Sequence, residues 1–193
     1  MRKLILLVGL LMAASDPSHA EETHRPYAGL QAREIATLSQ SDIDDLEAGR
    51  GWGFALAAEL NGHPGPAHVL DLADALGLTA DQVARVERIF EDMRDDAMER
   101  GVAFIAAERA LDTAFSQGGL GAAELAALVE AAGQARSALR YVHLSRHLET
   151  VEILTADQIA AYNILRGYTA DPCQNVPEGH NADMWRRHNG CEG

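Results

Sequence analysis

Two histidines, His143 and His147, are the residues of this sequence best placed to act together chemically. The letters around them, RYVHLSRHLETVE, have the periodicity of an α-helix. A spacing of four puts both rings on one helix face, close enough to share a metal ion. The pair is therefore a candidate metal site. Two alternatives stay open: ion pairing with carboxylates, and a switch that titrates near neutral pH.

Carboxylates lie where ligands to complete this site are expected. If the helix bearing the histidines folds back near Gly119, residue 143 faces residue 96 and residue 147 faces residue 92. That segment reads EDMRDD, with aspartate at both positions and a methionine between them. Imidazole, carboxylate and thioether ligands suit zinc, nickel, cobalt or copper. The sequence thus predicts a metal site formed by His143, His147, Asp92 and Asp96.

The only two cysteines, Cys173 and Cys191, lie close to the end of the chain. In an oxidising compartment such a pair favours a disulfide, which would restrict the unfolded chain by about 3 kcal/mol in the entropy model. The alternative is a zinc site with His180 and His188, which lie between the cysteines.

The first residues predict export. Arg2 and Lys3 are basic, residues 4–14 form an apolar run, and small residues precede Glu21. This pattern is typical of a secretory signal peptide cleaved after Ala20, and the apolar run is too short to span a bilayer. We therefore expect the protein in the periplasm, where a disulfide can form.

The composition excludes some partners. The 193 residues carry a formal net charge of −13 at pH 7, and Lys3 is the only lysine. An acidic surface argues against nucleic acid and favours cations or basic partners, although solubility alone explains it equally well. The glycine-rich run at 49–53 lacks the Gly-Lys-Ser/Thr ending of a phosphate loop, and no nucleophile–base pair has a recognisable context. We expect no catalysis.

Two long helices must position the histidines. Apolar residues recur at alternating steps of three and four over residues 83–114 and again over 125–142. Gly118-Gly119 separates these stretches, and neither apolar stripe can be buried alone. The spacing predicts an all-α fold, without a sheet, built on a long antiparallel helical hairpin. The width of the stripes also favours a homodimer.

The pentapeptide LTADQ occurs twice and predicts where two helices begin. Each copy pairs a threonine with a glutamine three residues later: Thr79 with Gln82, and Thr155 with Gln158. Such a capping box satisfies backbone N–H groups at a helix start, and the aspartate between them suits the helix dipole. The motif alone explains a helix start and nothing more.

Two Leu-Thr-x-x-Gln motifs in an exported helical chain nevertheless resemble the Spy/CpxP family of periplasmic stress proteins. The wider group includes the periplasmic heavy-metal resistance and sensor proteins typified by ZraP and CnrX. The resemblance covers about residues 64–168. It implies a helical hairpin with shorter flanking helices, commonly paired into a curved dimer, and a non-enzymatic role. Members hold unfolded proteins, act on an envelope-stress sensor or bind transition metals.

The resemblance implies a function, and the charge of this chain differs from that of the chaperone members. We expect an envelope-stress protein that binds unfolded periplasmic proteins or a sensor protein; the alternative is a heavy-metal resistance or sensor protein using the histidine pair. Chaperone members carry a basic cradle, whereas this chain is acidic. Arginines at 85, 88, 94 and 100 are the candidates for a local basic strip.

Four segments follow from these patterns. They are a signal peptide (1–20), an N-terminal arm of short helices (21–63), the hairpin core (64–170), and a loop-rich tail with the cysteines (171–193).

Overall fold

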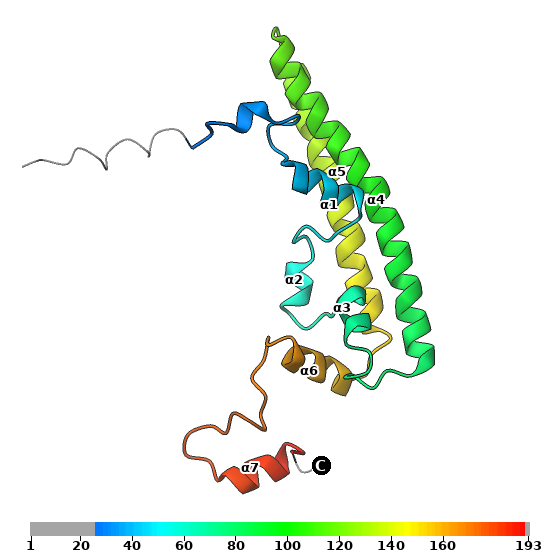
Figure 1. Cartoon of the computed structure of the whole chain (residues 1–193), viewed down its shortest axis with the longest axis vertical. Helices are drawn as coiled ribbons and strands as arrows, with labels where there is room; N and C mark the ends of the chain where they lie inside the picture. The colour runs from blue at the N-terminus through cyan, green and yellow to red at the C-terminus, as the bar shows by residue number, and fades with distance from the viewer. Residues whose placement is uncertain (1–25, 192–193) are drawn as a thin grey trace, which may run out of the picture.

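The computed structural model describes residues 26–191, and a long helical hairpin dominates it (Figure 1). Within this range there is no strand, only an isolated bridge between Ile35 and Leu38, so the all-α prediction is confirmed. In chain order the elements are the 3₁₀ helix η2 (Leu30–Ala32), α1 (Gln40–Glu47), α2 (Leu56–Glu59), α3 (Pro66–Asp71), α4 (Ala80–Gln117), α5 (Ala122–Val151), α6 (Ala156–Leu165) and α7 (Ala182–His188). The predicted signal peptide and its cleavage after Ala20 lie outside the described residues.

The hairpin consists of α4 and α5, and its ends agree with the predicted ones. Helix α4 begins after the capping box of Thr79 and ends at Gly118, whose φ of 72° favours glycine. Helix α5 runs back along α4 (Figure 1). None of the helices in residues 26–191 combines the length and the apolarity that crossing a membrane requires.

Short helices cover only the lower and middle parts of the hairpin. Helix α1, capped by Ser39, packs on α4, and α3 packs against both long helices. Their side chains create two apolar clusters. One, in the middle of the hairpin, includes Leu46, Met93 and Leu139. The other, at its base, includes Val86 and Tyr162. Burial of these clusters holds the arm and α6 to the hairpin.

Helix α1 crosses α4 at a glycine. A Cβ atom at Gly101 would overlap the backbone carbonyl group of Leu46, so α1 can lie this close only because position 101 has no side chain. Glycine in a helix interior costs about 1 kcal/mol relative to alanine. The close contact offsets this cost through the burial of Leu46, which is 1% exposed.

Both predicted capping boxes are present, and their glutamines also bind each other. Gln82 Nε2 donates to Gln158 Oε1 at 2.8 Å, and Gln158 Nε2 donates to Gln82 Oε1 at 3.2 Å. Each amide also donates to a carbonyl before the other motif, Gln82 to Ile153 and Gln158 to Leu76. The repeated motif thus joins the starts of α4 and α6 through what we call the glutamine pair.

We expect Gln82→Ala and Gln158→Ala each to lower the free energy of unfolding by about 1–2 kcal/mol, because each removes a cap and a side-chain partner. The double variant should lose less than the sum of both, with a coupling of about 0.5–1 kcal/mol. Urea unfolding of the four proteins measures this. Gln134→Ala, on the exposed face of α5, is the control and should change stability by less than about 0.5 kcal/mol. If the loss in the double variant equals the sum of the two single losses, the hydrogen bonds between Gln82 and Gln158 contribute no stability of their own.

The tail is tied to itself by a disulfide. Cys173 and Cys191 are bonded, with their Cα atoms 5.4 Å apart, which confirms the disulfide. The zinc alternative with His180 and His188 is therefore wrong, because both sulfurs are already bonded to each other.

The tail is also more ordered than predicted, since it contains α7, capped by Asn181. Trp185 stacks edge-on against His180 and donates from its indole N–H to the carbonyl of Pro172. Its aromatic and hydrogen-bond contacts thus lie inside the tail. Figure 1 shows α7 set apart from the hairpin.

Candidate functional site

The structure does not bring the four predicted metal ligands together. Asp92 and Asp96 lie on the exposed side of α4, and Asp96 accepts a hydrogen bond from Arg146 at 2.8 Å. His143 and His147 are buried, 2% and 6% exposed, on a different face of the hairpin. Among residues 26–191 no three His, Cys, Asp or Glu side chains converge as a metal ion would require. The four-ligand metal site stays a prediction, and this arrangement of side chains does not support it.

The histidines instead face the N-terminal arm. Phe54 stacks on His143 with ring centroids 6.3 Å apart, and His147 Nδ1 lies 2.6 Å from the carbonyl oxygen of His63. A Cβ at Gly65 would come within 2.7 Å of the His147 ring, so this glycine lets the arm lie flat against the imidazole. His143 Nε2 is buried without a hydrogen-bond partner, which costs about 1–3 kcal/mol.

A buried carboxylate, Glu59, lies beside His147. Glu59 is 5% exposed and accepts hydrogen bonds from the hydroxyls of Tyr162 and Tyr168 and from the backbone N–H of Gly65. His68 Nδ1 approaches it to 3.3 Å, Arg166 Nε to 3.7 Å and His147 Nδ1 to 3.8 Å. The sequence analysis missed this residue. The available signal was a single acid in the otherwise apolar run ALAAEL, directly before the Pro-Gly-Pro turn.

The surroundings lower the pKa values of Glu59 and His143. Burial alone raises the pKa of Glu59, but hydrogen bonds from Tyr162 and Tyr168 and the nearby charges of His68 and His147 outweigh it and lower the pKa below 4.5. Burial, assisted by the charge of His147, lowers the pKa of His143 below 6.5. His143 is therefore neutral and Glu59 charged at neutral pH.

Stability should consequently fall on acidification in two stages. The unfolded chain binds protons more tightly than the folded protein at both groups. The free energy of unfolding should decrease first below pH 6.5, as His143 takes up a proton in the unfolded state, and again below pH 4.5, as Glu59 does. Urea unfolding between pH 8 and pH 3 tests both stages. His143→Phe should remove the first stage, while His180→Phe, exposed in the tail, should keep it. An unchanged profile in His143→Phe would contradict this assignment.

The histidine cavity is the space between these residues and the arm. It measures about 490 Å³ and is walled mainly by apolar side chains, including Trp52, Phe90 and Met93. Glu59, His68, His143 and His147 contribute the polar part of its wall.

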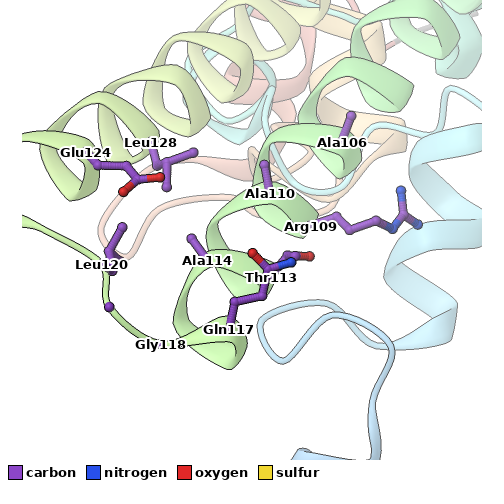
Figure 2. Close-up of a pocket in the computed structure, with 11 residues that line it drawn as sticks. Ala106, Arg109, Ala110, Thr113, Ala114, Gln117, Gly118, Leu120, Glu124 and Leu128 are labelled. Atoms are coloured by element: carbon purple, nitrogen blue, oxygen red, sulfur yellow. The ribbon is translucent and has the colours of Figure 1, made fainter.

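The far end of the hairpin carries a second hollow, the tip groove. From residue 106 to residue 131 no side chain is fully buried, because the apolar clusters stop below it and the arm reaches it only through polar contacts of residues 34–37 with Glu108, Arg109 and Asp112. Alanines of α4 line one side and Leu128 with Glu124 the other, and these alanines are too short to fill the space between the helices (Figure 2). The groove measures about 500 Å³.

Apolar surface surrounds this groove, and its nearest cation is paired. Phe115 and Val129 within the tip, and Val102 just below it, are each more than half exposed. Arg109 is one of the residues that line the groove, and its guanidinium, which Figure 2 shows turned away from Leu120 and Leu128, binds Glu34 at 2.8 Å. The groove is lined by polar and apolar groups in similar measure, and the large apolar residues exposed on the tip are the kind of surface that receives an apolar partner.

The predicted basic strip on α4 is compensated by acidic neighbours. Arg85, Arg94 and Arg100 lie within 4 Å of Asp81, Asp95 and Glu99, respectively. Charge attraction along α4 is thus weak, and the tip groove is the more distinctive surface.

Comparison of the chain with protein families, with characterised proteins and with solved structures found no significant match.

Proposed function

We propose that this chain is a non-enzymatic binding protein of the bacterial periplasm, of the Spy/CpxP type, that holds apolar segments of unfolded proteins in its tip groove. The observation that carries this proposal is the tip itself: 26 residues of paired helix and turn, 106–131, with no buried side chain and with large apolar residues exposed. A protein gains no stability from such a surface, so its use lies in contact with another molecule.

Three further features support the assignment to the periplasm and to this type. The disulfide of the tail is consistent with an oxidising compartment. Both Leu-Thr-x-x-Gln motifs start a helix and bind each other, which gives the repeat a common structural purpose. The signal peptide predicted for residues 1–20 agrees with export.

Light scattering of a denatured test protein diluted from urea measures client holding. The wild type should suppress aggregation, and Ala110→Glu, which puts a charge into the groove, should weaken holding roughly tenfold, equivalent to a loss of about 1.4 kcal/mol. Ala127→Glu is the matched control, because Ala127 is exposed on the same tip but does not line the groove. A wild type that fails to suppress aggregation would refute client holding. Equal suppression of aggregation by all three proteins would show that clients bind outside the tip groove.

A sensor protein is the second partner consistent with this surface, and a second copy of the chain is the third. Sedimentation velocity of the same three proteins separates self-association from client holding. A homodimer that pairs its tip grooves would dissociate in Ala110→Glu and persist in Ala127→Glu. A dimer unaffected by either substitution would place its interface elsewhere.

A further inference from the structure

The histidine cavity is separate from the tip groove and has properties of its own. The two hollows share no lining residue, so each is a distinct place for a ligand. At about 490 Å³, the histidine cavity lies in the range of small-molecule sites, and its wall is mainly apolar with a few polar groups. It therefore has the size and the composition of a site for a small compound.

The apolar part of the wall contains two aromatic side chains, Trp52 and Phe90, among aliphatic ones. Trp52 packs edge-on against Phe54 at 5.2 Å and near Phe104 at 5.9 Å, so its indole is held by other rings. Phe90 and Met93 of α4 also line the cavity, and both thioethers and aromatic rings favour contact with a further aromatic ring. This part of the cavity suits a flat, aromatic body.

The polar part of the wall contains one group that lacks a partner. Glu59 already accepts from two tyrosine hydroxyls and a backbone N–H group, so it offers little to an incoming donor. His143 lines the cavity, and its Nε2 has no hydrogen-bond partner within the protein. Buried polar atoms in proteins are almost always paired. This nitrogen has almost no exposed surface, so a ligand in the cavity reaches it when the imidazole turns, and the nitrogen then gains the partner it lacks.

The charges around the cavity select against ionic ligands. An anion would face the carboxylate of Glu59, while the arginines in the wall, Arg50 and Arg94, already pair with Asp45 and Asp95. A cation would lose its hydration without gaining a free carboxylate. A neutral compound meets neither cost.

We propose that the histidine cavity binds a small neutral aromatic compound with one hydroxyl group, whose ring packs on Trp52 and Phe90 and whose hydroxyl bonds to His143. 2-Naphthol represents this class, and its methyl ether, 2-methoxynaphthalene, lacks only the O–H donor.

NMR titration of protein carrying ¹⁵N-labelled imidazoles tests this proposal. With 2-naphthol the nitrogen signals of His143 should shift saturably, and the affinity should exceed that for the methyl ether about tenfold, as expected for one hydrogen bond. His143→Phe should bind both compounds equally, whereas His180→Phe should keep the preference. If His143→Phe does not fold, the imidazole signals of the wild type still report the contact.

Three results would overturn the proposal: no saturable shift at His143, equal affinity of the wild type for both compounds, or a preference that persists in His143→Phe. None of these concerns the tip groove, so they leave client holding untouched.

Discussion

Replacing Glu59 with alanine is expected to lower the free energy of unfolding by about 3–5 kcal/mol, the range for removing one partner of a buried ionic network. The carboxylate ties α2 to α3, α5 and α6, because its partners Gly65, His147 and Tyr162 belong to or adjoin those helices. Without it the hydroxyl of Tyr162, a residue with no solvent exposure, loses its hydrogen-bond acceptor. Urea unfolding followed by circular dichroism measures the loss.

Two further variants separate charge from hydrogen bonding at this position. Glu59→Gln keeps an oxygen that can accept from Tyr162 and Tyr168, so we expect a smaller loss, about 1–3 kcal/mol. Glu47→Ala, exposed at the end of α1, should change stability by less than about 0.5 kcal/mol. A loss below about 1 kcal/mol in Glu59→Ala would show that the network does not hold the arm in place.

The second large effect is expected at Gly101. Alanine favours a helix interior over glycine by about 1 kcal/mol, yet we expect Gly101→Ala to lower the free energy of unfolding by about 2 kcal/mol. The added methyl group meets the backbone of Leu46, which cannot rotate away, so α1 must move as a whole. Trp52 reports this movement, since its indole N–H donates to Asp42 of α1 at 2.8 Å. In a Trp185→Phe background Trp52 is the only tryptophan, and Gly101→Ala should then change the fluorescence of the protein.

A matched control for Gly101 exists in the other long helix. Gly133 of α5 is exposed and has no heavy atom within 4 Å of where a Cβ would stand. Gly133→Ala should therefore raise the free energy of unfolding by up to about 1 kcal/mol. If both alanine variants gain stability, the contact between α1 and α4 is not the tight one described.

The parts of the fold that the sequence predicted correctly depend on local rules. A capping box is complete within four residues, and a helical stripe repeats every turn, so the starts of α4 and α6 and the end of α4 were all visible in the letters. The disulfide required only two cysteines and an oxidising compartment. None of these needs knowledge of distant contacts.

The predicted metal site placed its four ligands by their distance across the hairpin, which does not determine which face a residue occupies. Met93 and Ala97 form the buried stripe of α4, and each lies one position, about 100°, beyond Asp92 and Asp96. The aspartates therefore point outwards while the histidines point towards the arm. The arm itself could not be placed from periodicity, since its helices are short and its path depends on glycines. For that reason the sequence could show Glu59 only as a single acid in an apolar run, and neither its partners nor the cavity beside it could be predicted.

The glutamine pair also has a consequence for the size of the molecule. It joins the start of α4 to the start of α6, close to where α5 ends, and the apolar clusters reach residue 105, just below the tip groove. Because α4 and α5 run antiparallel, removing two turns from each beside the connecting loop would shorten the hairpin by about 10 Å without moving any residue at the base. The length of the hairpin can thus change without changing the fold. Insertions or deletions of equal length in α4 and α5 would lengthen or shorten it, while the residues at its base stay the same.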